Sequence, residues 1–308
     1  MKSSLIALKN ITEPHNDIDL LIVSATGEPR SWYFLEKIHR QCKLRWFIPE
    51  FNPRHSPFEI SDSITERDIL ALPIERYSLK EKLQNFFRDG QVKPVIAVDI
   101  SCMSRPVMAE VFQELFSQAT SQRFKIVVLY SIAEYTPPPN WLPVNEDIRP
   151  VSSAFAGWPH DSAASTSLIV GLGYEKNKAE GACEYFDPSE VWVFVPHSPL
   201  HEFDADVLNN NQELVGRESR HGRELAYPVN DPERTFGSLV ATVTSLISRS
   251  NPLILPFGPK IFFALSLLVA ELYEEVGVWL VTGDLAGGAN DHNASDFSVC
   301  FEFELGSS

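Results

Sequence analysis

Two stretches of the chain share one pattern, and this repeat limits the possible folds more than any other feature. In each stretch an apolar strand ends in a loop with glycine, a helix follows, and a second apolar strand stops at proline. A constant offset of 147 residues aligns Ile22 with Ile169, Glu28 with Glu175, Phe47 with Phe194 and Pro49 with Pro196. A duplicated unit would place two equivalent loops around a pseudo-two-fold axis, so we expect the functional surface between the two halves. The alternative is that two α/β segments merely look alike.

Length and charge narrow the class of protein. The 308 residues suffice for two domains of ordinary size, and 44% hydrophobic with 22% charged residues is typical of a globular protein. The net charge of −15 argues against long DNA or RNA as a partner, because the surface as a whole repels a phosphate backbone. A local basic pocket for a small anion remains compatible with this charge, which is a sum over the whole surface.

Cysteines and apolar runs indicate the compartment. The four cysteines are far apart and form no CxxC pair, so the sequence predicts neither a zinc motif nor a disulfide framework. The chain starts without the apolar segment of a signal peptide, and its longest apolar run, residues 261–270, is too short to span a bilayer. We therefore expect a cytoplasmic protein with no metal, no cofactor and no membrane association.

Periodicity predicts strands that alternate with helices in both halves. We expect strands over residues 19–24, 44–48, 94–100, 124–130, 167–170, 191–195, 252–256 and 276–282, and helices over residues 31–41, 79–87, 106–116, 175–185, 235–247 and 259–272. This order predicts an α/β fold of two tandem Rossmann-like units, each a doubly wound parallel sheet, related by a pseudo-two-fold axis. We expect an N-terminal unit over residues 1–134, a linker over 135–165, and a C-terminal unit over 166–308. The alternating apolar residues of 296–305 predict a terminal edge strand in that last unit.

Ligands of open parallel sheets bind beyond the carboxyl ends of the strands, which selects four loops here. These are residues 24–28, 99–105, 171–175 and 257–260. Small residues let a ligand approach the backbone, and helix N-termini attract anions. In each half one helix begins with a basic residue, Arg105 or Lys260. The candidate ligand-binding residues are Ser24, Thr26, Gly27, Asp99, Ser101, Ser104, Arg105, Gly171, Gly173, Gly258 and Lys260. The alternative is that the glycines only serve tight turns and that Arg105 forms a surface ion pair.

One loop carries a sharper motif. Asp99-x-Ser101-x-x-x-Arg105, placed after a strand and at the start of a helix, resembles the [DN]x[ST]xxx[RK] signature of CARF domains. The resemblance implies a Rossmann-like sensor of cyclic oligoadenylates or related nucleotides, used in signalling and antiviral defence. Two such units in one chain also resemble the SAVED arrangement. The second half keeps a cation in Lys260 and lacks the Asp and Ser, which predicts an asymmetric ligand or one dominant half-site.

Three functions are compatible with these features. The first is a non-catalytic sensor that binds a nucleotide-type ligand and acts on a separate effector protein. The second is a metal-independent phosphodiesterase, similar to a ring nuclease, that degrades such a ligand. The third is a scaffold subunit with empty pockets. For a bound nucleotide we expect Ser101 and Ser104 to contact phosphate or ribose, Arg105 to clamp phosphate, and Asp99 to orient the loop. We expect Lys260 to reach the ligand from the other half. Glu28 and Glu175 are either bases or ribose acceptors, or simply favourable charges at a helix start.

Overall fold

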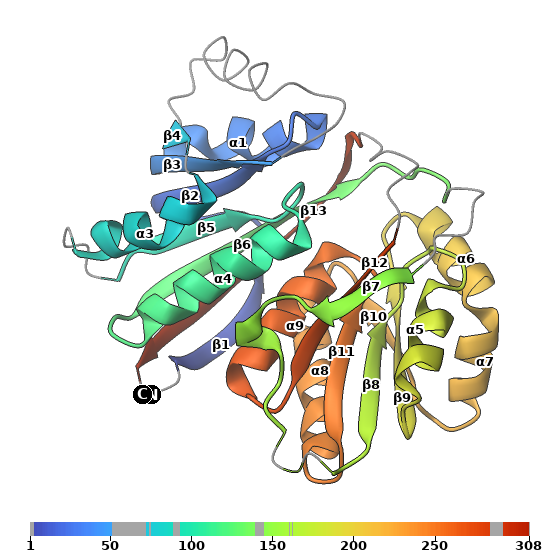
Figure 1. The fold of residues 1–308 in the computed structure, drawn as a ribbon. Coiled ribbons are helices and arrows are strands. Elements are labelled where there is room, and N and C mark those ends of the chain that lie inside the picture. The colour runs from blue at the N-terminus through green and yellow to red at the C-terminus, as the bar shows by residue number, and fades with distance from the viewer. Residues whose placement is uncertain are drawn as a thin grey trace. The chain divides into compact units, whose positions relative to one another are not determined.

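The chain divides into two compact units, each with one mixed β-sheet. The computed structural model describes residues 3–50, 72–73, 75–88, 93–138, 145–159, 161, 163–283 and 292–307. The first unit combines Met1–Glu134 with Gly288–Ser308, and the second is Tyr135–Gly287 (Figure 1). Strands and helices alternate along most of both units, so the protein belongs to the α/β class.

The first unit contains a seven-stranded sheet in the order β1-β13-β6-β5-β2-β3-β4. Its strands are β1 (Ser3–Ile11), β2 (Ile18–Ala25), β3 (Cys42–Pro49), β4 (Leu72–Pro73), β5 (Val95–Asp99), β6 (Phe124–Ala133) and β13 (Ala294–Ser307). The strands β4, β3, β2, β5 and β6 run parallel, whereas β13 pairs antiparallel with both β6 and β1. The expected parallel sheet is therefore mixed.

Helices cover both faces of this sheet. On one face α1 (Tyr33–Ile38) packs through Phe34 and Leu35 in a core that includes Val23 and Phe47. On the other face lies α3 (Leu79–Arg88), which packs against α4 (Arg105–Ala119). The ring of Phe86 on α3 lies 6.0 Å from that of Trp46, whose side chain points away from that of its neighbour Phe47. Burial on both faces explains why β2 is a continuous apolar run.

The second unit contains a six-stranded sheet in the order β10-β9-β8-β11-β12-β7. Its strands are β7 (Asn145–Pro150), β8 (Thr166–Gly171), β9 (Glu190–His197), β10 (Glu224–Pro228), β11 (Asn251–Pro256) and β12 (Gly277–Gly283). Its helices are α5 (Lys178–Phe186), α6 (His201–Asn210), α7 (Gln212–Ser219), α8 (Pro232–Ile247) and α9 (Lys260–Leu272). Helices α5, α6 and α7 contribute Cys183, Val207 and Leu214 to the core on one face, while Phe262 of α9 contacts Phe194 on the other.

The two sheets have the same strand order over five positions, whereas the antiparallel strand next to them comes after the five in the chain in the first sheet (β13) and before the five in the second (β7). Read from β4, the first runs β4-β3-β2-β5-β6-β13; read from β10, the second runs β10-β9-β8-β11-β12-β7. In each, five parallel strands precede one antiparallel strand. The residue alignment, however, slips within this order. Val23 pairs with Phe47, but the equivalent Val170 pairs with Val193 and not with Phe194. The predicted match of Phe47 with Phe194, and with it that of Pro49 with Pro196, is therefore wrong by one residue.

The last strand belongs to the first unit, which corrects the predicted domain limits. β13 lies between β6 and β1, so it is not an edge strand of the second unit (Figure 1). The alternation of residues 296–305 predicts a strand correctly, but such a pattern carries no information about which sheet the strand joins. The expected linker is also partly ordered, because β7 within it pairs antiparallel with β12.

In each half a polar stretch follows the second strand, and the sequence predicts no helix or strand within it. In the second half this stretch, residues 196–228, contains α6, α7 and β10. In the first half the corresponding stretch, after Pro49, lies mostly outside the described residues. The N-terminal strand β1 was also not expected. β1 pairs with β13 from the other end of the chain, and pairing between distant segments leaves little local signal.

Candidate functional site

The first unit has a topological switch point between β2 and β5. From β2 the chain proceeds to β3 and β4 on one side, then returns to β5 and β6 on the other. The loops that leave β2 and β5 at this point are residues 24–28 and 99–105, because the two strands are neighbours and parallel. In open α/β sheets the crevice at such a point is the usual ligand site. The structure thus brings together two of the four predicted loops.

Glu50 lies between these two loops, and the sequence analysis did not select it. Glu50 follows β3, and its Oε1 atom accepts a hydrogen bond from the Ser24 hydroxyl at the end of β2. The same Oε1 lies 3.0 Å from the backbone N of Ser104, and Oε2 lies 3.3 Å from that N. One carboxylate therefore connects β2, β3 and the start of α4. The signal in the sequence is its place directly after Pro49, the proline that ends β3.

Ser104 has the position predicted for it, at the start of a helix. Its side chain accepts a hydrogen bond from the N–H of Val107 at 3.4 Å, and Pro106 occupies the first turn of α4. Both features are typical of a helix start. Arg105 is the first residue of α4 and half-exposed. The predicted cation at the helix start is thus present, next to the residue that contacts Glu50.

Ser101 and Asp99 form an internal network. Ser101 is fully buried, its hydroxyl donates to Asp99 Oδ1 at 2.5 Å, and its oxygen accepts from the N–H of Ser131 at 2.8 Å. The backbone N of Ser101 also donates to Asp99 Oδ1 at 2.9 Å. Asp99 therefore orients the loop, in the role proposed for it. The hydroxyl of Ser101 is therefore hydrogen-bonded within the protein, whereas the sequence predicts that it contacts phosphate or ribose.

The β2 loop holds a buried ion pair. Gly27 has a φ of 77°, a left-handed conformation that favours glycine, and the hydroxyl of Thr26 accepts from the N–H of Glu28 at 3.3 Å. The carboxylate of Glu28 pairs with Arg30 at 3.1 Å. Arg30 is only 6% exposed. Burial acts to lower the pKa of Arg30, but the neighbouring Cys102, Tyr130 and Glu28 outweigh it and raise that pKa. The carboxylate of Glu28 is therefore paired with the buried guanidinium group of Arg30.

In the second unit the equivalent loops, residues 171–175 and 257–260, are hydrogen-bonded directly to each other. The backbone N atoms of Phe257 and Gly258 both donate to the oxygen of Gly171, at 2.9 and 3.0 Å. A Cβ on Gly258 would lie 2.3 Å from the oxygen of Leu172, and a Cβ on Gly171 would lie 2.4 Å from the ring of Phe262. The side chain of Asn211 donates to the oxygen of Gly173 at 2.9 Å. The glycines here serve close packing within the protein, as in the alternative interpretation. Lys260 is the first residue of α9 and directly follows Gly258 and Pro259.

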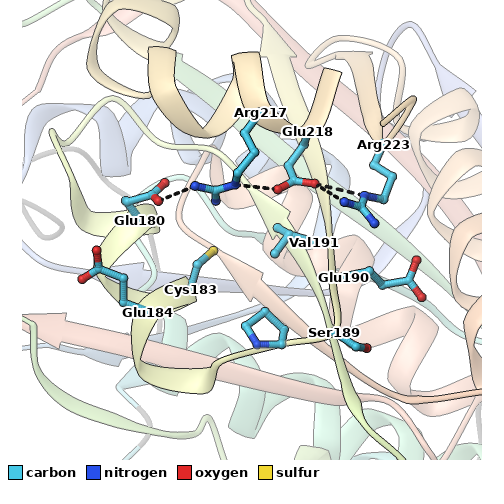
Figure 2. A pocket seen from close by; sticks show the side chains of 10 residues that line it. Glu180, Cys183, Glu184, Ser189, Glu190, Val191, Arg217, Glu218 and Arg223 are labelled. Carbon is cyan, nitrogen blue, oxygen red and sulfur yellow. Dashed lines mark hydrogen bonds and ion pairs between the residues drawn. The ribbon is translucent and has the colours of Figure 1, made fainter. Parts of the chain in front are cut away.

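Three hollows among the described residues of the second unit lie at the amino ends of its strands, opposite the loops above. Figure 2 shows one of them, near the amino ends of β9 and β10, where four charged side chains form a chain of ion pairs. Arg217 pairs with Glu180 at 2.7 Å and with Glu218 at 2.9 Å, and Arg223 pairs with Glu218 at 2.8 Å. Hydrogen bonds with Glu180 and Glu218 raise the pKa of Arg217. These charges satisfy one another, and their place at the amino ends is not where a doubly wound sheet binds ligands.

The cysteines lie inside the two units. All four are buried and free. Burial raises the pKa of Cys42 to about 11 and those of Cys183 and Cys300 to about 12, so these three thiols stay protonated at neutral pH. Within the described residues, no group of three His, Cys, Asp or Glu side chains could hold a metal ion. The helices of this part of the chain are all too short or too polar to cross a membrane.

Fold and site together define a two-unit α/β protein in which polar loops meet at the switch point of the first unit. No family model and no curated protein matches the chain. Among solved structures, the cytoplasmic domain of a prokaryotic cation chloride cotransporter aligns with a TM-score of 0.24 and 8% sequence identity. That alignment covers 87% of this chain and 96% of the other. A likeness at this level identifies neither a fold nor a function.

Proposed function

We propose that the protein binds a nucleotide-type ligand at the switch-point crevice of its first unit and acts as a sensor on a separate effector protein. The observation that carries the proposal is the joint placement of two predicted loops. Residues 24–28 and 99–105 leave neighbouring strands at the switch point, and the carboxylate of Glu50 connects them through Ser24 and Ser104. The second of these loops contains the motif that resembles CARF domains, and the resemblance supplies the ligand class and the role in defence signalling.

In this proposal the ligand's phosphate lies against Arg105. The guanidinium group forms paired, charge-assisted hydrogen bonds with phosphate oxygens, and the start of a helix adds a favourable field. Ser24 and Thr26 are buried and act indirectly, because the Ser24 hydroxyl donates to Glu50 and the Thr26 hydroxyl accepts from the N–H of Glu28. Ser101 acts indirectly, because its hydrogen bonds to Asp99 and Ser131 hold the loop in shape.

The site of the first unit is the dominant one. In the second unit the loops 171–175 and 257–260 bond directly to each other, and protein atoms fill the space beside the glycines. A ligand would have to break these contacts to enter. This contrast supports the prediction of one dominant half-site.

We further propose that the two units are Rossmann-like copies that arose by internal duplication, and that the protein works in the cytoplasm. The shared order of five strands supports duplication. The one-residue slip between β3 and β9 requires a small insertion or deletion after the copying event. Four buried, free cysteines fit a reducing compartment.

Thermal unfolding with a panel of cyclic and linear ribonucleotides tests the proposed binding. We expect at least one nucleotide, at about 100 times its dissociation constant, to add about 2.7 kcal/mol of stability and raise the melting temperature by about 5 °C. Arg105→Ala should abolish this shift, whereas Lys260→Ala should preserve it. Arg88→Ala, at an exposed position at the end of α3, is the matched control. If no nucleotide shifts the melting temperature of the unaltered protein, the proposal is wrong.

A further inference from the structure

We infer that Glu50 recognises a ribose hydroxyl of the ligand, so that the site selects ribonucleotides over 2′-deoxyribonucleotides. The inference rests on the proposed nucleotide-binding function and goes beyond it, because it names the ligand's sugar and the residue that reads it. It also begins from a residue outside the CARF-like motif, since Glu50 follows β3 whereas the motif follows β5.

The carboxylate of Glu50 is held in place before any ligand arrives. Its Oε1 atom accepts from two donors on different elements, the Ser24 hydroxyl and the Ser104 backbone N. The contact of Oε2 with the same Ser104 N is longer, at 3.3 Å. Each carboxylate oxygen accepts about two hydrogen bonds. Among the described residues, Oε2 therefore keeps accepting capacity, on a half-buried side chain whose direction is fixed through Oε1.

The charge of Glu50 decides which part of a nucleotide can face it. A carboxylate is an acceptor and repels phosphate, so the group beside it must be a hydrogen-bond donor. Because Ser104 contacts Glu50 and the next residue is Arg105, a phosphate bound by Arg105 lies close to this carboxylate. The donor nearest to a phosphate in a nucleotide is a hydroxyl of the attached ribose. The geometry thus favours the sugar over the base as the partner of Glu50.

The position of Glu50 in the fold supports the same assignment. In dinucleotide-binding sheets, an acidic side chain about 20 residues after the glycine loop accepts a ribose hydroxyl at the end of the neighbouring strand. Glu50 directly follows the strand next to β2 and lies 23 residues after Gly27. The phosphate loop differs from that fingerprint, but the place of the acidic residue is the same.

Matched oligonucleotides test the inference. The probes are linear tetra-adenylate with a 5′-phosphate in its ribo form and in its 2′-deoxy form, which carry the same charge. Calorimetric titration of the full chain should give about tenfold tighter binding of the ribo form, because a hydrogen bond to a charged group is at stake. Glu50→Ala should weaken the ribo form to the level of the deoxy form and leave the deoxy form within about twofold. Glu50→Gln, which keeps the shape and an acceptor oxygen, should give an intermediate ratio.

The controls separate this inference from the proposed function. Glu81→Ala, on the exposed side of α3, should keep the ratio of the unaltered protein, and circular dichroism checks that each variant is folded. If both probes bind equally, or if Glu50→Ala and Glu50→Gln retain the full preference for ribose, the role of Glu50 is refuted while nucleotide binding stands. If neither probe nor any other nucleotide binds the unaltered protein, the proposed function fails and the inference fails with it.

Discussion

The hydroxyl of Ser101 joins two polar groups that water does not reach. We predict that Ser101→Ala lowers the free energy of unfolding by about 2–3 kcal/mol, because it removes a donor to Asp99 and an acceptor for the Ser131 N–H. Urea unfolding measures this loss. Ser117→Ala, at an exposed position of α4, should change stability by less than about 0.5 kcal/mol. A Ser101→Ala variant as stable as the Ser117→Ala control would show that the network is dispensable.

The buried carboxylate of Glu302 makes the stability of the protein depend on pH in the acid range. Burial acts to raise the pKa of Glu302, but hydrogen bonds with His15, Lys9 and Lys125 outweigh it and lower the pKa to about 2. Because the folded-state pKa is depressed, the stabilisation is complete above about pH 4.5 and is lost as the pH falls toward 2. We predict that Glu302→Gln costs roughly 2 kcal/mol at neutral pH and flattens the loss of stability between pH 4.5 and 2. Urea titrations at stepped pH measure both effects. An unchanged slope in the variant would contradict this assignment.

The loops of the second unit depend on one close approach of backbones. A Cβ at Gly258 would lie 2.3 Å from the oxygen of Leu172, so Gly258→Ala must push the two loops apart. We predict a loss of about 2–4 kcal/mol, as for other forced shifts in a packed region. Gly237→Ala is the matched control, because Gly237 lies within α8 and a Cβ there meets nothing within 4 Å. That change should stabilise the helix by about 0.5–1 kcal/mol. Denaturant unfolding that ranks the two variants in the opposite order would exclude the close approach.

Local periodicity predicts most of these elements, and long-range pairing explains the errors. The core strand at residues 19–24 and the helix at 106–116 were placed within a few residues, because an apolar run and an apolar helix face are local signals. The match of Phe47 with Phe194 failed, since a one-residue slip moves a side chain to the other face of a sheet. The site shows the same limit. The two loops at the switch point were predicted, whereas Glu50 was missed, because the sequence does not show that a residue after β3 reaches Ser104.

At the scale of the whole molecule, the first unit is built from two separate parts of the chain. β13 pairs with β6 from Ala294↔Ala133 to Leu305↔Phe124, and with β1 from Ser3↔Ser307 to Ile11↔Cys300. Without β13, β1 has no neighbour in the sheet, and β6 becomes an edge strand that is paired on one side. The second unit is continuous, and all six strands of its sheet lie within Tyr135–Gly287. The two units should therefore respond differently when the chain is cut at the boundary between them.

We predict that a fragment of residues 135–287 unfolds cooperatively in urea, while a fragment of residues 1–134 does not. The control is a fusion of residues 288–308 to residues 1–134 through a short glycine–serine linker. Because Ser307 pairs with Ser3, the linker joins two adjacent ends, and the fused strand can take its place between β6 and β1. Far-ultraviolet circular dichroism during urea titration should show a cooperative transition for the fusion and a gradual one for residues 1–134. The prediction depends on hydrogen bonds and buried apolar side chains such as Phe301 and Phe303 that only β13 supplies. Cooperative unfolding of residues 1–134 alone would mean that β6 forms a stable edge, and that β13 is an addition to the fold of this unit and not one of its essential strands.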